Sequence, residues 1–166
     1  TSGAPSLSLR AIARELGMAS SAIYRYFACR DDLITALLLE SYEALADLGE
    51  AADASVADQT DLDARWLAVW RAIRRWAVTN PHDYALLYGS PVPGYRAPDT
   101  TIVPVTRLTR TFARLLRLVV EAGGLPVASL ELDADARASI ASAQEFFGDG
   151  VSDVGVVRGL MAWTGL

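Results

Sequence analysis

Residues 20–25, Ser-Ser-Ala-Ile-Tyr-Arg, gather two hydroxyls, a methyl group, a phenol and a guanidinium within six positions. The hydroxyls of Ser20 and Ser21 can hydrogen-bond base edges or phosphates, and the methyl group of Ala22 can touch a thymine methyl. Arg25 projects from the same short stretch and can reach a base or a phosphate. Ser20, Ser21 and Ala22 discriminate among bases less well than an arginine that makes two hydrogen bonds to one guanine. They can equally be helix-start residues without a base contact.

Two short helices joined by a glycine turn are expected to position these residues. In the first, apolar residues recur at i, i+3, i+4 and i+7, which is one face of a helix: Leu9, Ile12, Ala13 and Leu16. Ser8 is well placed as its N-cap, and Gly17 can adopt the left-handed conformation that ends a helix. A second helix, roughly 20–27, carries Ile23 and Phe27 inward. Helix, glycine turn, helix is the layout of a DNA-binding helix-turn-helix.

The same stretch resembles the N-terminal domain of TetR/AcrR-type one-component transcriptional regulators. The resemblance rests on Leu-Arg-x-Ile-Ala-x-Glu-Leu-Gly-Met, then Ala-Ile-Tyr-Arg-Tyr-Phe, then Arg-Asp-Asp-Leu. Its most specific part is the aromatic block Tyr24-x-Tyr26-Phe27 before a basic residue and an acidic helix start. It is clear over residues 7–38 and looser afterwards, as expected of a family whose C-terminal region varies.

The resemblance implies DNA-contact roles. In such regulators the first turn of the recognition helix, here 20–22, faces base edges in the major groove. The positions of Tyr24 and Tyr26 contact phosphates through the hydroxyl, which positions the protein without specifying sequence. Because the two tyrosines lie two residues apart, they cannot both face the core, and the alternative is that one packs under the helix. Arg30 matches a position usually occupied by lysine, at the start of a long connecting helix.

Two more candidates, Ser8 and Arg10, open the first helix of the motif. They can hold the opposite phosphate strand, partly through the helix N-terminus. One departure from the family pattern is Ala19, which stands where Ser or Thr usually caps the recognition helix. Capping must then fall to Ser20 or be lost, at a cost of about 1 kcal/mol.

A second departure is Cys29, the single cysteine, at the cap of the next helix with Asp32 three residues on. A thiol beside Arg30 at a helix N-terminus can have a depressed pKa and act as a redox sensor. The favoured interpretation is a small residue tolerated at a cap.

Charge is divided unevenly along the chain. The net charge is −5, but residues 1–30 carry +3 from four Arg and one Glu, and the other 136 carry −8 from 11 Arg and 19 Asp or Glu. This predicts a small basic head on an acidic body. With only +3, one copy would bind DNA weakly through phosphates. Two heads of a homodimer on the half-sites of a palindromic operator would correct that shortfall.

The ends are expected to be incomplete. The resemblance implies a further helix before the motif, and residues 1–7 are too short and too rich in Gly, Ser and Pro to form it. Residues 156–166 stop inside an apolar stretch without a helix stop signal. The sequence is therefore interpreted as a fragment whose head lacks its first helix and whose C-terminus is truncated.

Composition sets further bounds. A chain of 166 residues with 52% hydrophobic content can bury a core in one body plus a small head. We expect a head with the start of the connecting helix at 1–48, and a ligand-binding and dimerisation domain at 49–166. One cysteine excludes a disulfide framework and fits a reducing compartment. No signal peptide or apolar run of about 18 residues is visible, so a cytoplasmic protein without a membrane segment is expected.

Helical periodicity continues to the end and no alternating strand pattern occurs, which predicts an all-α fold. A proline-rich surface loop is expected at 89–101. The further helices are expected at 31–52, 61–80, 82–88, 101–122, 133–147 and 151–166.

An aromatic set follows the apolar stripe of the helix at 61–80 and continues into the next: Trp66, Trp70, Trp76, Tyr84 and Tyr88. These side chains form either part of the core or the lining of a ligand cavity. The resemblance implies an effector site between these helices, which would suit an apolar or flat aromatic small molecule.

A stripe of four arginines follows on the helix at 101–122: Arg107, Arg110, Arg114 and Arg117. It can hold an anionic ligand group, but a solvated face paired with Asp and Glu is favoured. His82 is the only histidine and has no cluster of ligands near it in sequence, so no metal site is expected. No catalytic motif occurs, so we expect neither an enzyme nor a cofactor.

Together these features predict a ligand-responsive transcriptional regulator, a homodimeric repressor that a small molecule releases from its operator. By resemblance the last two helices form the dimer interface, with Leu160 and Trp163 as candidates. Effector binding would shift the helix at 31–52 and change the spacing of the two heads. The alternative is a helical ligand- or partner-binding module of the same fold that has lost DNA binding.

Overall fold

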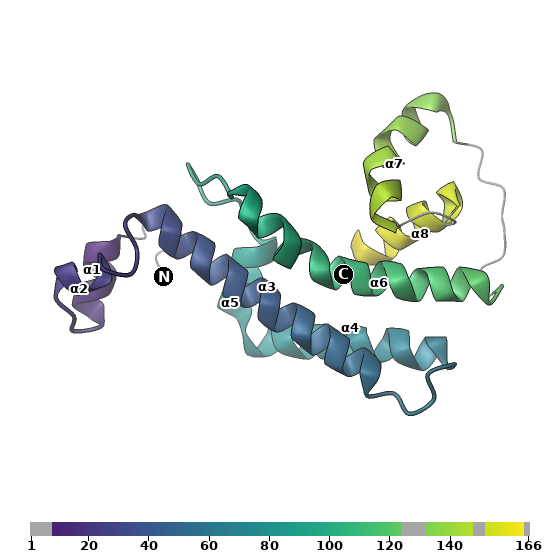
Figure 1. The fold of residues 1–166 in the computed structure, drawn as a ribbon, viewed down its shortest axis with the longest axis horizontal. Coiled ribbons are helices and arrows are strands. Elements are labelled where there is room, and N and C mark those ends of the chain that lie inside the picture. The colour runs from purple at the N-terminus through teal and green to yellow at the C-terminus, as the bar shows by residue number, and fades with distance from the viewer. Residues whose placement is uncertain (1–7, 124–131, 148–151, 165–166) are drawn as a thin grey trace. The chain divides into compact units, whose positions relative to one another are not determined.

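The computed structural model describes residues 8–123, 132–147 and 152–164. Within these ranges the chain forms helices and turns but no strand (Figure 1), which confirms the all-α prediction. No described helix is both long and apolar enough to cross a membrane. The helices are α1 Leu9–Glu15, α2 Ser20–Ile23, α3 Arg30–Ala54, α4 Leu62–Thr79, α5 Pro81–Tyr88, the 3-10 helix η2 Asp99–Thr101, α6 Ile102–Glu121, α7 Ala134–Phe147 and α8 Asp153–Thr164.

The helix boundaries lie close to those expected, apart from α2. It was expected to reach residue 27, but it ends at Ile23 and the chain continues in turns. The amide of Arg25 bonds the carbonyl of Ala22 at 3.3 Å, and that of Tyr26 bonds the carbonyl of Ile23 at 3.0 Å. These bonds span three residues instead of four, so the backbone tightens out of the α-helical geometry at this point.

Two compact units divide the chain. One comprises residues 1–46 and 74–105, and the other comprises 47–73 and 106–166. Helices α3 and α4 therefore supply residues to both units. These units do not test the expected division into a DNA-binding head at 1–48 and a ligand-binding and dimerisation domain at 49–166, which stays a prediction.

The head has a small core of its own in the first unit. It is formed by the buried Leu9, Ala13, Ile23 and Leu33, with Ile12 and Phe27 packed against them. The predicted inward faces of the two short helices are therefore correct at these positions. Leu16 is the exception: it was expected on the same face but is 65% exposed, because α1 ends one residue before it.

In the second unit, α6 meets α7 and α8 in an apolar cluster. Ala113 and Leu116 of α6 are buried with Ile140 of α7 and Val156 of α8. Helices α7 and α8 also lie against each other (Figure 1). This packing gives the C-terminal helices a common anchor on α6.

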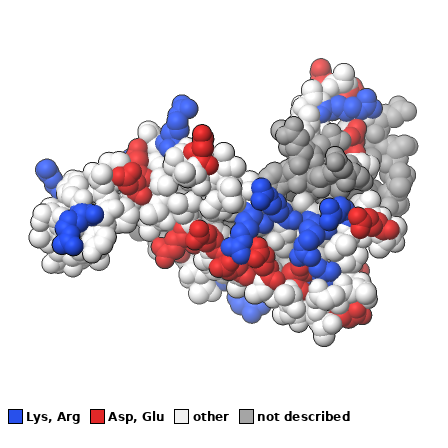
Figure 2. Space-filling view, in the orientation of Figure 1, with Lys and Arg blue, Asp and Glu red and all other residues white. Residues whose placement is uncertain are grey.

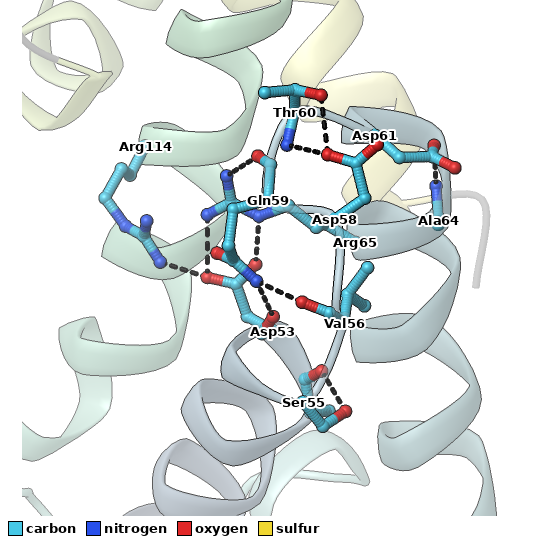
Figure 3. A network of polar contacts seen from close by, with 11 residues as sticks. Asp53, Ser55, Val56, Asp58, Gln59, Thr60, Asp61, Ala64, Arg65 and Arg114 are labelled. Atoms are coloured by element: carbon cyan, nitrogen blue, oxygen red, sulfur yellow. Dashed lines mark hydrogen bonds and ion pairs between the residues drawn. The ribbon is translucent and has the colours of Figure 1, made fainter.

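A buried polar network joins α3, α4 and α6 in the second unit (Figure 3). The Asp53 carboxylate accepts hydrogen bonds from Arg65 Nε at 2.7 Å and Nη2 at 3.2 Å. Arg114 of α6 donates to the same carboxylate. Arg65 also donates to the Gln59 carbonyl at 2.9 Å, so the loop between α3 and α4 closes around its guanidinium.

The sequence alone did not identify this network. The helix expected at 31–52 ended just before Asp53, yet this residue lies in the last turn of α3 and is only 3% exposed. Arg65 lies on α4 and is only 5% exposed. Burial raises the pKa of the Asp53 carboxyl, but hydrogen bonds from Arg65 and Arg114 and their charges outweigh it. The pKa of Asp53 is therefore lower than usual.

We expect Asp53→Asn to lower the free energy of unfolding by about 3 kcal/mol, because it leaves the buried Arg65 guanidinium without its counter-charge. Urea denaturation measures this difference. The matched control is Asp47→Asn, the same change on the same helix at a side chain that is 67% exposed. It should have a far smaller effect, because exposed ion pairs contribute little. Equal losses in both variants would contradict a special role for Asp53.

The same carboxylate predicts a pH dependence. Its pKa is lower in the folded protein than in the unfolded chain, where it is about 3.9, so the folded state binds fewer protons. Its contribution to stability is therefore complete above about pH 4 and is lost as the pH falls through the folded-state pKa. Urea denaturation at a series of pH values should show the gap between the native protein and Asp53→Asn narrowing in acid. A gap independent of pH would refute this.

Candidate nucleic-acid interface

The turn between α1 and α2 is closed by backbone bonds that require its glycine. Gly17 has a φ of +65°, the left-handed conformation expected of it. The amide of Met18 bonds the carbonyl of Ala13 at 2.8 Å, and that of Gly17 bonds the carbonyl of Arg14 at 3.2 Å. This pair of bonds is a Schellman motif, which satisfies the last carbonyls of α1 and turns the chain toward α2. The two helices pack against each other.

The first turn of α2 presents small polar side chains. Ser20 and Ser21 are exposed and Ala22 is half-buried. Ala19 occupies the N-cap position, and no side-chain hydrogen bond caps the helix. The side-chain cap of this helix is therefore lost instead of being taken over by Ser20. The hydroxyls of both serines are left for an external partner.

Both tyrosines of the aromatic block reach solvent. Tyr24 is 44% exposed and Tyr26 is 71% exposed, so neither packs under the helix in the part of the chain that the structure describes. The Arg25 guanidinium carbon lies 5.9 Å from the centre of the Tyr26 ring. The turn after α2 thus offers two phenol hydroxyls and one guanidinium on the outside of the head.

The remaining DNA-contact candidates lie at the starts of α1 and α3. Ser8 occupies the N-cap position of α1 and is exposed, but its side chain makes no capping bond. Arg10 is exposed on the first turn of the same helix. Arg30 begins α3, has a side chain that is 27% exposed, and lies 3.8 Å from the Asp31 carboxylate. The structure therefore places all three on the head, next to the turn-forming segments.

Cys29 takes part in a helix cap through its backbone. Its amide donates to the Asp32 carboxylate at 3.1 Å, which is the reciprocal half of a capping box. Asp31 and Asp32 also place negative charge in the first turn of α3, where the helix dipole favours it. This backbone cap agrees with the favoured interpretation of Cys29 as a small residue tolerated at the position.

The charges of head and body are organised differently (Figure 2). Arg107 bonds Glu50 at 2.8 and 2.5 Å and Asp47 at 2.7 Å, and these bonds raise its pKa. Arg117 lies 3.6 Å from Glu121 one turn on, and Arg114 pairs with Asp53 as described. The arginine stripe of α6 is thus a paired face at these three positions, as favoured from the sequence.

In the head, by contrast, Arg10, Arg14 and Arg25 form no ion pair with any described carboxylate. On the face that Figure 2 draws, the end of the chain that carries α1 and α2 accordingly shows basic side chains on otherwise uncharged surface, and acidic side chains begin with the first turn of α3. Unpaired surface arginines are the groups that attract a phosphate backbone.

The predicted ligand-lining aromatics divide into two groups in different units. In the second unit, Trp66 and Trp70 of α4 pack on each other at 6.0 Å between ring centres. Both also pack on Phe112 of α6, at 5.2 and 4.4 Å. Phe112 is only 4% exposed and was not identified from the sequence. Trp66 and Trp70 are themselves half-buried, so in this group only Phe112 belongs to the buried core.

The other group lies in the first unit. Tyr84 and Tyr88 of α5 lie 5.1 Å apart between ring centres, and Tyr88 meets Tyr42 of α3 edge-on at 6.5 Å. Burial raises the pKa of Tyr42 and that of Tyr88, for which the nearby phenols add to the effect. Trp76 is half-buried in the same unit, and its carbonyl accepts a bond from the Asn80 side chain at 3.0 Å. We refer to Tyr42, Tyr84 and Tyr88 as the tyrosine cluster.

The two candidates for a dimer interface, Leu160 and Trp163, lie on α8. The course of that helix is described, but these two side chains lie outside the described residues. Their role stays a prediction.

Two family models match the chain. The model described as "Bacterial regulatory proteins, tetR family" matches residues 1–37, and the one described as "Tetracyclin repressor-like, C-terminal domain" matches residues 66–166. The first match contains α1, α2 and the turn after them. The second contains the aromatic residues of α4 and α5 and all the helices that follow.

Similar proteins carry regulatory descriptions. Two curated relatives are each 42% identical to this chain over 166 residues: the HTH-type transcriptional regulators Rv1816 of Mycobacterium tuberculosis and Mb1846 of Mycobacterium bovis. Those alignments cover 99% of this chain and 70% of each relative. A crystal structure described as that of a regulatory protein, SCO4313, superimposes with a TM-score of 0.72 at 34% identity, over 99% of this chain and 71% of the other. With its helix-turn-helix head and its all-α body, the chain belongs to the TetR family of bacterial transcriptional regulators.

Proposed function

We propose that this protein is a ligand-responsive repressor that binds a palindromic operator as a homodimer and is released from it by a small molecule. The observation that carries the proposal is the outer surface of the head. There Ser20, Ser21, Tyr24, Arg25 and Tyr26 are all exposed around one short helix. Hydroxyls and guanidinium groups in this arrangement can bond phosphates and base edges together.

The proposed DNA contacts follow the exposure of these groups. Ser20, Ser21 and Ala22 face the bases, while Tyr24 and Tyr26 bond phosphates. Ser8, Arg10 and Arg30 hold the backbone on either side. One head contributes few charges, so binding at physiological salt requires two heads. The last two helices, with Leu160 and Trp163, are assigned to the dimer contact that brings the heads together.

The proposed effector site is the tyrosine cluster, with the tryptophans Trp66, Trp70 and Trp76 as further candidates. The phenol hydroxyls of this cluster can each donate a hydrogen bond to an effector. Tyr42 and Arg30 lie on the same helix, 12 residues apart, which is about 18 Å along its axis. An effector that moves α5 against α3 would therefore displace the DNA-contacting end of α3. This constitutes allostery if the effector and DNA favour different positions of that helix.

The experiment that tests the function is selection of bound duplexes from a random DNA library. Enrichment of a palindrome is expected, and the half-site spacing then reports the distance between the two heads. No enrichment at low salt would overturn the repressor proposal and leave a ligand- or partner-binding module of the same fold as the better account.

Tyr24→Phe removes only the hydroxyl that is proposed to bond a phosphate. We expect it to weaken binding to the selected operator and to unrelated duplexes by the same factor, about fivefold, which fluorescence anisotropy measures. Tyr95→Phe is the matched control, because that hydroxyl bonds Thr35 at 2.8 Å and lies outside the proposed interface. A loss confined to particular sequences would show that Tyr24 contacts a base instead.

Tyr84→Leu removes one ring from the tyrosine cluster. For a compound that releases the protein from its operator, we expect the half-releasing concentration to rise about tenfold, through the lost aromatic contact. Affinity for the operator without the compound should stay unchanged. Trp66→Phe tests the other aromatic group in the same titration, and a larger shift there than in Tyr84→Leu would move the effector site to the tryptophans.

A further inference from the structure

The residues proposed to face the bases carry little information for recognition. Ser20 and Ser21 each offer one hydroxyl, and Ala22 offers a methyl group that is half-buried. A single hydroxyl serves as donor or acceptor, so it discriminates weakly among base pairs. Sequence-specific binding therefore needs another side chain near α2.

Arg25 is the one residue between Ala19 and Phe27 with a forked set of donors. Its side chain is exposed and forms no ion pair with any carboxylate that the structure describes. No described carboxylate therefore competes for the N–H donors of the guanidinium. An arginine that bonds both O6 and N7 of guanine is the commonest specific contact in the major groove.

The backbone beneath Arg25 is fixed to the core of the head. Its amide bonds the Ala22 carbonyl at 3.3 Å, and the next two amides, of Tyr26 and Phe27, both bond the Ile23 carbonyl at 3.0 Å. Ile23 is 5% exposed and belongs to the head core. The backbone at Arg25 is therefore held in place by hydrogen bonds to residues of α2.

The ring of Tyr26 restrains the guanidinium itself. The 5.9 Å between the Arg25 guanidinium carbon and the ring centre lies within the range of a cation–π contact. Such a contact leaves the edge of the guanidinium, which carries the N–H donors, available to a base. Tyr26 thus acts on recognition through Arg25, as a positioning residue, in addition to its own phosphate contact.

We propose that Arg25, held by the ring of Tyr26, recognises a guanine in each half-site and is the main determinant of operator sequence. This inference rests on the proposed DNA-binding function. It assigns the sequence preference to the turn after α2 instead of to the first turn of α2.

The test uses Arg25→Lys, which keeps the positive charge but removes the fork. Duplex selection with the native protein should enrich a guanine at one position of each half-site. Substituting that guanine should cost the native protein about tenfold in affinity and cost Arg25→Ala almost nothing. Arg25→Lys should show an intermediate loss, because an ammonium still donates to guanine but without the fork. The dependence of affinity on salt should be the same for the native protein and Arg25→Lys, because the number of phosphate contacts is unchanged. The control is Arg14→Ala, an exposed arginine of α1 outside the contact set, which should keep the guanine preference.

Two variants of Tyr26 test the positioning role. Tyr26→Phe keeps the ring and should keep the guanine preference, even where overall affinity falls. Tyr26→Leu removes the ring and should reduce that preference several-fold. A guanine preference that survives undiminished in Arg25→Ala overturns the inference, because another residue then recognises the guanine. A loss in Arg25→Ala that is equal for all sequences also overturns it and makes Arg25 a phosphate contact. The absence of any enriched site with the native protein overturns the DNA-binding function and this inference with it.

Discussion

The Asp53 carboxylate is buried between two guanidinium groups, and the junction of α3, α4 and α6 depends on it. Removing ions from water is costly, and a buried pair is tolerated when hydrogen bonds satisfy its atoms. Here Arg65 divides its donors between Asp53 and the Gln59 carbonyl, while the Gln59 side chain bonds the carbonyls of Asp53 and Val56 at 3.3 and 2.6 Å. The polar loop therefore folds around the ion pair, and the ion pair links residues of α3, α4 and α6.

The sequence predicted the helices well because apolar periodicity and caps are local signals. Asp61, for example, was expected at a helix start and bonds the amide of Ala64 at 2.9 Å as its cap. The same logic misplaced Asp53 and missed Arg65, since a charged residue in a polar stretch indicates solvent when its partner lies 12 or 61 positions away. The α2 helix was overestimated because its apolar residues are compatible with a tight turn as well as with a helix.

The candidate sites were also predicted only where the residues that form them are close in sequence. The exposed head residues followed from motif positions, because their neighbours in space are also neighbours in sequence. The aromatic set did not: the rings that complete each group, Phe112 and Tyr42, come from α6 and α3. The two groups also differ in chemistry. Trp66 and Trp70 pack on the buried, wholly apolar ring of Phe112, whereas Tyr84 and Tyr88 pack on each other and each carries a polar hydroxyl.

Helix α3 is continuous from Arg30 through Tyr42, and this continuity fixes an angle as well as a length. Each residue of an α-helix advances the axis by about 1.5 Å and turns it by about 100°. One residue inserted between Leu33, the last residue of the head core, and Tyr42 would leave that core intact but rotate the head by about 100° relative to Tyr42. If α3 couples the proposed effector site to the proposed DNA contacts, substitutions on the exposed side of this segment would be tolerated better than single-residue insertions or deletions. The number of residues between the two proposed sites would then matter more than the identity of the exposed ones.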